Sequence, residues 1–184
     1  RSMPNVVDGL KLSQRKALCG SFMKGILKTE SKVAQLTGFV SDKTQYHHGE
    51  SSMSGTIVGM AQDFVGANNI NFLLPKGQLG SRISNGADAA SPRYTFVQMN
   101  PVTPLIFKKE DGAVLNWTED EGVVTEPVYH VPVISTLLAN GCKSIATGYS
   151  TTIHQYNPID LIRNVKKRLN GKRPIKLKPF YRGF

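Results

Sequence analysis

The residue types that could act on a phosphodiester gather in two short stretches of the sequence. Arg93-Tyr94 follows a glycine-punctuated stretch, and His47-His48 precedes a helical pattern. A tyrosine oxygen can attack phosphorus while a neighbouring guanidinium faces the charge that develops on the phosphoryl oxygens. That chemistry would join a protein to DNA reversibly. Because most tyrosines are packing residues, an arginine–tyrosine pair alone is a weak signal, and the interpretation depends on the surrounding segments.

Charge favours a polyanionic partner. The 184 residues include 23 lysines and arginines against 13 acids, a formal net charge of +10, and nucleic acid is the commonest partner of so basic a chain. RNA or an acidic membrane surface is also compatible with this composition. The charge is uneven, with nine bases and no acid in residues 161–184 and six acids and no base in residues 110–126. We expect the acidic stretch to be a solvated loop that faces away from DNA.

Cysteine use and hydropathy exclude several protein classes. Cys19 and Cys142 lie far apart without metal-ligand spacing, and we expect both to be reduced packing residues. No apolar run approaches the roughly 20 residues of a membrane span, and no signal peptide is expected in this sequence. The abrupt ends of the sequence predict a segment of a longer protein.

The elements that must position Tyr94 and the histidines follow from periodicity. Apolar spacing predicts helices over residues 14–28, 33–40 and 53–64, with Glu50, Ser51 and Ser52 capping the third. Short strands are expected over residues 71–74 and 94–97, joined by a glycine-rich loop that carries Lys76 and Arg82. This order predicts an α+β fold that begins with a winged helix. The loop is then a wing along a phosphate backbone or a simple hairpin connection.

The second half of the sequence predicts further elements. Residues 128–138 are rich in Val, Ile and Leu and favour a strand followed by a helix. A final helix is expected to begin with Asn157 as its cap and Pro158 at its first position, and to end at Gly171. Its expected buried stripe is Leu161, Ile162, Val165 and Leu169. The predicted domains are a winged-helix domain over residues 1–133 and the start of a second, α/β domain over residues 134–184.

Eight segments resemble a known family in order along nearly the whole chain. They are residues 1–11, 14–16, 32–36, 46–50, 61–66, 68–69, 91–94 and 147–151. Together they resemble the DNA breakage–reunion region of type IIA DNA topoisomerases, specifically the eukaryotic and large-DNA-virus branch. Leu12-Ser13 stands where the family usually has Pro-Gly, and Ser144-Ile145-Ala146 replaces the common Gly-Ile-Gly. Both departures touch loops rather than reactive groups and indicate a divergent member.

The resemblance implies roles for particular residues. Tyr94 would be the nucleophile that forms a 5′-phosphotyrosyl link, Arg93 would stabilise the transition state, and His48 would contact the scissile phosphate. A free phenol has a pKa of about 10 and needs cations or a base to attack at neutral pH. His47 is placed among the DNA-binding residues, with fixing of the turn as its alternative role.

The resemblance also implies a DNA-binding set with a basic and an apolar part. Arg1, Lys11 and Arg15 would line the DNA groove, and Asp8 would orient one of them. Ile145 would wedge between base pairs and bend the duplex; from its spacing alone it would be a core residue. By the same resemblance, residues 134–184 would be the N-terminal part of the family's tower domain.

The implied function is part of an ATP-dependent type II topoisomerase, which breaks both strands of a duplex transiently, passes a second duplex and reseals the break. No Glu…Asp-x-Asp pattern occurs in the sequence, so no metal or other cofactor is expected within it. Mg²⁺ and ATP would bind in domains of the intact enzyme that this chain lacks, and we predict that the chain alone binds duplex DNA weakly and does not cleave it.

The intact enzyme would be a homodimer in the nucleus, or in a host cytoplasmic viral factory, without membrane association. The alternative is a winged-helix DNA-binding module without catalysis, which would have no use for an Arg-Tyr pair or an apolar wedge.

Overall fold

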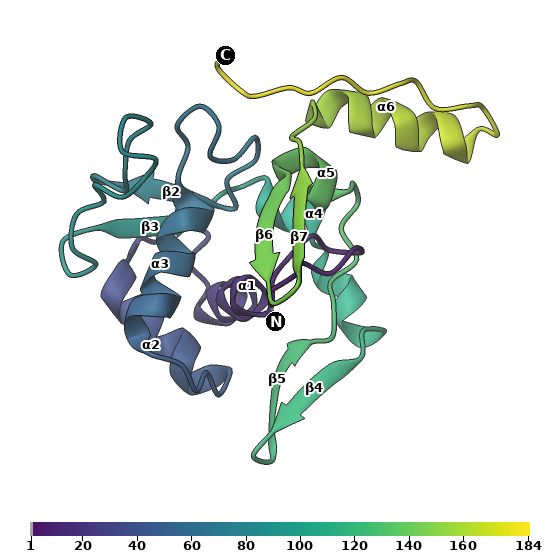
Figure 1. Ribbon diagram of the computed structural model, residues 1–184. Helices are drawn as coiled ribbons and strands as arrows, with labels where there is room; N and C mark the ends of the chain where they lie inside the picture. Colours follow the sequence, from purple (N-terminus) through teal and green to yellow (C-terminus); the bar gives the residue numbers. More distant parts are fainter. Residues whose placement is uncertain (1) are drawn as a thin grey trace.

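The computed structural model describes residues 2–184 and combines helices with short antiparallel strands. Three helices come first, namely α1 (Leu12–Lys24), α2 (Val33–Lys43) and α3 (Glu50–Ala61). A small antiparallel sheet in the order β1-β3-β2 consists of β1 (Ser31–Lys32), β2 (Leu73–Lys76) and β3 (Phe96–Met99). Figure 1 shows β2 and β3 beside α3. The three helices and the strands β2 and β3 follow the predicted order along the chain, while the winged-helix assignment stays a prediction.

The second half of the chain is built from two hairpins and short helices. The first hairpin follows α4 (Thr103–Ile106) and a 3-10 helix (Lys109–Ala113), and consists of β4 (Trp117–Asp120) and β5 (Val123–Pro127). The second lies between α5 and α6: the elements are α5 (Thr136–Asn140), β6 (Cys142–Ala146), β7 (Tyr149–Ile153) and α6 (Pro158–Leu169). In Figure 1 the two hairpins project separately, and α6 lies at the far side with the C-terminal segment along it. Among residues 2–184, no helix has both the length and the apolar character needed to cross a bilayer.

The core lies between the three helices and the sheet. Leu18 of α1, Leu36 of α2 and Ile57 of α3 have no exposed surface and share one cluster with Leu73 and Val97 of the sheet. Burying such a side chain contributes about 1.5–3 kcal/mol. The helical spacing read from the sequence therefore identified the buried faces of all three helices.

Some elements begin or end at other residues than the sequence suggests. α1 ends at Lys24 rather than at residue 28, because Gly25 is left-handed (φ 70°) and its N–H bonds back to the last turn. β3 begins at Phe96 rather than Tyr94, because Tyr94 N donates to Ser91 O at 2.9 Å and closes a turn. Tyr94 is thereby lifted out of the sheet. The ends of α3 and β2 differ from expectation by only a few residues.

The strand expected within residues 128–138 is wrong. This stretch forms no strand, and its backbone bonds go to three different segments instead of one partner strand. Val128 N donates to Asn116 O, Val133 N to Ile106 O, and His130 N to the side chain of Asp8. The helix that follows is present as α5. Aliphatic composition alone cannot distinguish such a covering segment from a strand.

The buried stripe expected on the last helix is also wrong. Asn157 caps α6 as predicted, since its Oδ1 accepts from Ile159 N at 2.9 Å, and Pro158 is the first helical residue. Of the four apolar positions only Leu161 is buried, whereas Ile162, Val165 and Leu169 are exposed. The helix therefore contacts the described part of the chain along a narrow line.

Asn69 joins the first half of the chain to the second. Its Nδ2 lies 2.9, 3.1 and 3.0 Å from the carbonyl oxygens of Ala139, Tyr156 and Phe180. Its Oδ1 accepts from Arg182 N at 2.8 Å. The side chain is buried, so these bonds are shielded from water and each is worth about 1 kcal/mol.

Candidate nucleic-acid interface

Tyr94 lies at the surface on a turn that α2 holds in place. The residue is 72% exposed, so the phenol is open to a large ligand. The backbone on either side of it is fixed, because Val33 N donates to Thr95 O and Ala34 N to Pro92 O, both at 3.0 Å. A fixed backbone with an accessible hydroxyl is the arrangement that a nucleophile needs.

Arg93 lies beside the phenol. Its guanidinium carbon is 5.6 Å from the centroid of the Tyr94 ring, within the range of a cation–π contact. Its Nε is 3.4 Å from Ser91 Oγ, and the residue is exposed. The two residues that the sequence singled out first are thus in contact with each other at the surface.

Gln62 holds the glycine-rich loop that leads to this turn. Its Nε2 donates to Leu79 O at 2.9 Å and to Gly86 O at 3.2 Å. A Cβ atom on Gly86 would collide with that Nε2, and one on Gly80 would lie 2.7 Å from it. Both glycines are therefore required for the loop to close around the amide.

A groove of about 490 Å³ lies between α3 and this loop. Ser51, in the first turn of α3, and Pro92, on the tyrosine turn, both line it. Ser51 follows the two histidines closely in sequence, and Pro92 precedes Tyr94. The groove therefore lies between segments that adjoin the two stretches with the candidate chemistry.

His47 and His48 are exposed on the turn that precedes α3. The ring of His48 packs edge-to-face against Tyr46 with centroids 5.3 Å apart, and the Tyr46 hydroxyl donates to Ser52 Oγ at 3.0 Å. The N-terminus of a helix favours an anion, although Glu50 already places a carboxylate in this first turn. The turn thus presents two imidazoles beside a helix end.

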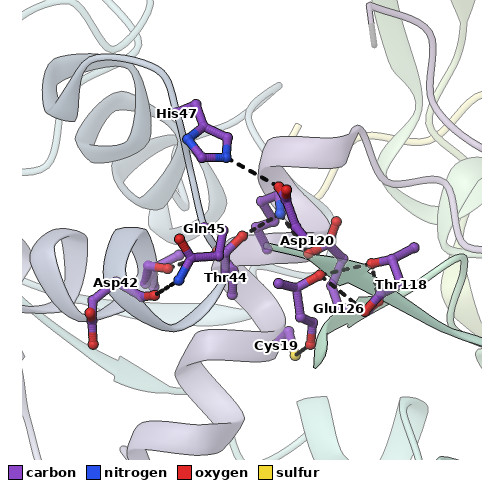
Figure 2. A network of polar contacts seen from close by, with 11 residues as sticks. Cys19, Asp42, Thr44, Gln45, His47, Thr118, Asp120 and Glu126 are labelled. Carbon is purple, nitrogen blue, oxygen red and sulfur yellow. Dashed lines mark hydrogen bonds and ion pairs between the residues drawn. The ribbon is translucent and has the colours of Figure 1, made fainter. Parts of the chain in front are cut away.

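The expectation that the acidic stretch is a solvated loop is wrong for its second part, and the expectation that it faces away from DNA stays a prediction. Residues 117–127 form the β4–β5 hairpin. Asp120 Oδ2 lies 3.2 Å from His47 Nε2, and Glu126 is buried with its Oε2 2.7 Å from Lys16 Nζ. Two acids of the hairpin thus have partners on the helical part, and Figure 2 shows the Asp120 carboxylate near His47.

Arg15 is an interior residue, which corrects its place among the groove-lining cations. Its Nε and Nη2 donate to the two carboxylate oxygens of Asp8 at 2.7 and 3.1 Å, and Nη2 also donates to Leu10 O at 3.0 Å. Both side chains are nearly inaccessible. Asp8 does hold one of the cations, as expected, but the pair braces the entry to α1 instead of facing a ligand.

Lys11 and the β6–β7 hairpin share a second groove, of about 460 Å³. Lys11 lines it from the start of α1, and Cys142 and Lys143 line it from β6. Ile145 is paired with Ser150 near the hairpin end and is 74% exposed. It is therefore not a core residue, and an exposed aliphatic group at a hairpin end has the shape that a wedge requires.

The remaining basic candidates lie apart from these groups. Lys76 Nζ is 3.5 Å from Glu30 Oε1 at the surface, and Arg82 is exposed on the glycine-rich loop. Arg1 lies outside the described residues. No contact joins Lys76 or Arg82 to the histidine turn among the described residues.

Both cysteines are free thiols, as the sequence predicts. Burial raises the pKa of Cys19 to about 12, with the carboxylate of Glu126 acting in the same direction and Lys16 opposing it. A thiol with so high a pKa stays protonated and unreactive. Cys142 lies within 3.0 Å of Ser144 Oγ.

Sequence reasoning missed three residues that shape this surface. Asp120 was read only as part of an acidic run, although its partner His47 lies far away in sequence. Gln62 and Asn69 stood within segments that carried the resemblance, but no local pattern indicated that their amides bind distant carbonyls. Contacts of this kind depend on the fold, because each partner is supplied by another element.

Comparisons with known proteins identify the family to which the chain belongs. The family model for the A-type subunit of DNA gyrase/topoisomerase IV matches residues 1–184. The chain is 50% identical over 184 residues to "DNA topoisomerase 2" of Arabidopsis thaliana, covering 100% of this chain and 12% of that protein. It is 48% identical over 182 residues to "DNA topoisomerase 2" of Acanthamoeba polyphaga mimivirus, covering 99% of this chain and 14% of that protein.

A solved structure supports the same relationship. The topoisomerase II DNA-binding, cleavage and re-ligation domain of Plasmodium falciparum superposes with a TM-score of 0.97 at 48% identity, covering 100% of this chain and 25% of that one. The α+β fold and the resemblance stated from the sequence are confirmed. Because the chain spans only 12–14% of the curated relatives named above, its kinship is established for this region. The chain belongs to the family of DNA gyrase/topoisomerase IV A-type subunits.

Proposed function

We propose that the chain supplies the half of a type II topoisomerase active site that carries the nucleophile. The Tyr94 phenolic oxygen attacks phosphorus in a DNA strand, so that a bond between this oxygen and the 5′-phosphate forms as the bond to the 3′-oxygen breaks. The phenolic proton leaves, and the 3′-oxygen takes up a proton. One phosphodiester replaces another, so the reverse attack by the 3′-hydroxyl can reseal the strand.

The contact between Arg93 and an exposed Tyr94 on a fixed turn carries this proposal. The guanidinium is close enough to face the negative charge that grows on the phosphoryl oxygens. His48 is proposed to donate to the same phosphate from its exposed turn. A preorganised pair of donors lowers the barrier without moving at the moment of reaction.

The remaining surface is proposed to hold duplex DNA. Lys11, His47, Lys76 and Arg82 would contact the backbone, as would Arg1. Ile145 would enter between base pairs from the β6–β7 hairpin. Arg15 leaves this set, because an interior guanidinium already bound to Asp8 has no side open to a phosphate. We assign residues 1–133 to the winged-helix cleavage domain and residues 134–184 to the beginning of the tower domain.

The metal and nucleotide of the intact enzyme are assigned to other regions of the protein. Mg²⁺ prefers several carboxylate oxygens, and residues 2–184 bring no three His, Cys, Asp or Glu side chains together as a metal site. Two of the acids near the histidines, Asp120 and Glu126, are already bound to His47 and Lys16. The residues present do not fit the ion, so the steps above involve only this chain and DNA.

The intact protein is proposed to act as an ATP-dependent homodimer. Two copies of Tyr94 would then cut opposite strands with a short stagger, and a second duplex would pass through the break. The eukaryotic and viral relatives support a site of action in the nucleus or in a viral factory. By itself the chain is expected to bind duplex DNA weakly and to leave it intact.

The test is covalent trapping. The chain is joined to the metal-binding region of a relative, incubated with duplex DNA and Mg²⁺, and denatured, and protein–DNA adduct is counted. Wild-type protein should form adduct, and Tyr94→Phe should form none because the attacking oxygen is gone. Tyr149→Phe is the matched control, since Tyr149 is exposed to a similar degree (77%) and should behave as wild type. Adduct formation by Tyr94→Phe would contradict the proposal and leave the non-catalytic DNA-binding module.

A further inference from the structure

Asp120 is the one acid of the β4–β5 hairpin that touches the histidine turn among the described residues. It ends β4, and its Oδ2 lies 3.2 Å from Nε2 of His47. Both side chains are about half exposed, so a ligand on this face would meet them together. In Figure 2 the His47 ring is directed toward the Asp120 carboxylate.

The base of the β4–β5 hairpin is fixed, so the Asp120 carboxylate is held in place. Lys16 Nζ donates to Glu126 Oε2 at 2.7 Å and also to the carbonyl oxygen of Thr44. Thr118 Oγ1 donates to Glu126 O at 2.6 Å and ties the two strands together. A buried charge pair with a further hydrogen bond resists opening, because separation would leave charge without a partner in the interior.

Lys16 also joins the hairpin to the start of the histidine turn. Thr44 directly follows α2 as its C-cap, and Gln45 comes next with a left-handed backbone (φ 46°). Tyr46 N then donates to Ser41 O at 3.0 Å. The turn is therefore anchored before the histidines by Lys16 and after them by α3, and the Asp120 carboxylate holds the ring of His47 between these anchors.

We propose that Asp120 is a positioning residue for the strand-cleavage reaction. By accepting a hydrogen bond from His47 Nε2 it sets the orientation of that imidazole, and through the adjoining backbone it aims His48 at the scissile phosphate. This inference rests on the proposed function. Asp120 touches neither the phosphate nor Tyr94 and acts only through His47.

Asp120 also has an electrostatic effect that opposes DNA binding. A carboxylate beside a phosphate site repels the ligand, and Glu119 and Glu121 add two more acids at the same hairpin end. Glu119 lines the same cavity as the histidines, about 510 Å³ in volume. A residue that only carried charge would weaken binding and do nothing else. A positioning residue must also speed the step that follows binding, and this difference can be measured.

The experiment separates binding from cleavage in the joined protein described above. Asp120→Ala removes the acceptor and the charge, and Asp120→Asn keeps an acceptor oxygen but removes the charge. Glu121→Gln is the matched control, because it removes one charge from the neighbouring exposed position without touching His47. Affinity is measured from a fluorescent duplex, and the rate of adduct formation is measured with DNA at saturation.

We expect Asp120→Ala and Glu121→Gln to bind duplex equally well or a few-fold more tightly than wild type. At saturating DNA, Asp120→Ala should lower the cleavage rate about tenfold, as expected for a misplaced reacting group, whereas Glu121→Gln should leave it unchanged. Asp120→Asn should recover most of the rate. In the double variant His47→Ala/Asp120→Ala the second change should have no further effect.

The other outcomes distinguish a failure of this inference from a failure of the proposed function. Equal cleavage rates for Asp120→Ala and Glu121→Gln, with a wild type that forms Tyr94-dependent adduct, would overturn the positioning role alone. Absence of adduct from the wild type would overturn the proposed function and this inference with it. Additive losses in the double variant would show that Asp120 acts independently of His47. Thermal melting of each variant checks that the fold is retained, as expected for a half-exposed side chain.

Discussion

Arg15 Nε lies 2.7 Å from Asp8 Oδ2, and neither side chain is more than 8% exposed. The Asp8 carboxylate also accepts from Leu10 N at 2.9 Å and from His130 N at 3.0 Å. The Asp8 carboxylate thus binds both the segment that leads into α1 and the segment around His130, more than a hundred residues away in the sequence. Removing it would leave a buried cation and two backbone donors without their acceptor.

We predict that Asp8→Ala lowers the free energy of unfolding by about 3–5 kcal/mol, because breaking a buried pair leaves an uncompensated charge. Urea unfolding followed by circular dichroism measures the change. Asp42→Ala is the control, since Asp42 pairs with Lys43 at the exposed surface and such pairs contribute about 0–1 kcal/mol. Similar losses in both variants would contradict the structural role given to Asp8.

His130 makes the stability of the protein depend on pH. Burial lowers its pKa to about 4, and although the Asp8 carboxylate opposes this shift, the Arg15 guanidinium adds to it. Its Nε2 has no hydrogen-bond partner among the described residues. The unfolded chain, in which the pKa is near about 6.5, therefore binds more protons than the folded protein between these two values. Stability should fall as pH decreases from about 6.5 towards 4.

The expected loss across this window is about 3 kcal/mol, from about 1.36 kcal/mol for each pKa unit. It is measured as the difference in unfolding free energy between wild type and His130→Leu at a series of pH values. His154→Gln, which changes an exposed imidazole, should follow the wild-type curve. A His130→Leu curve parallel to wild type would show that this imidazole is already charged in the folded protein.

Gln62 should control the order of the loop that carries Tyr94. Its amide binds the carbonyl oxygens of Leu79 and Gly86, so Gln62→Ala removes both bonds, at about 1 kcal/mol each. Amide hydrogen exchange over residues 77–93 should become about tenfold faster or more. Gln98→Ala is the control, because its amide donates to Leu27 O at the surface. Unchanged exchange in Gln62→Ala would mean that the loop is held by other contacts.

Ile145→Ala should reduce DNA bending while affecting the cleavage chemistry less. Unstacking a base step costs a few kcal/mol, and an alanine side chain is too short to fill the opened step. Bending is measured by energy transfer between dyes at the two ends of a duplex. Leu169→Ala, at another highly exposed aliphatic residue (82%), is the matched control. Bending by Ile145→Ala equal to that of wild type would refute the wedge.

The sequence predicts those parts of the fold that depend on neighbouring residues. Periodicity located α1, α2 and α3 because apolar residues at helical spacing lie in the buried surface of each helix, and Asn157-Pro158 located the start of α6 because capping is a local interaction. The β4–β5 hairpin was not predicted, since two of its acids pair with Lys16 and His47 from distant segments. Residues 128–138 were misread because their backbone N–H groups bond to separate segments rather than to one partner strand.

The candidate site, like the fold, was predicted where residue type gives a signal and missed where burial depends on distant segments. Tyr94, Arg93 and the histidines were identified from residue type and from resemblance, and the structure brings Tyr94 and Arg93 into contact. Arg15 was misplaced because an arginine in a basic sequence gives no sign of burial. Its partner Asp8 lies nearby in sequence, but only the packing of residues 128–138 against them removes the pair from water.

The four bonds of Asn69 fasten the loop after α3 to α5, to Tyr156 between β7 and α6, and to the C-terminal segment. These bonds link the segments on either side of the β6–β7 hairpin, which carries Ile145, to the loop between α3 and β2. The hairpin cannot move relative to the part of the chain that carries Tyr94 unless the bonds of this amide break. If a duplex contacts both as proposed, the DNA rather than the protein is expected to change its curvature, and the strain of that fit would fall on the nucleic acid near the proposed cleavage site.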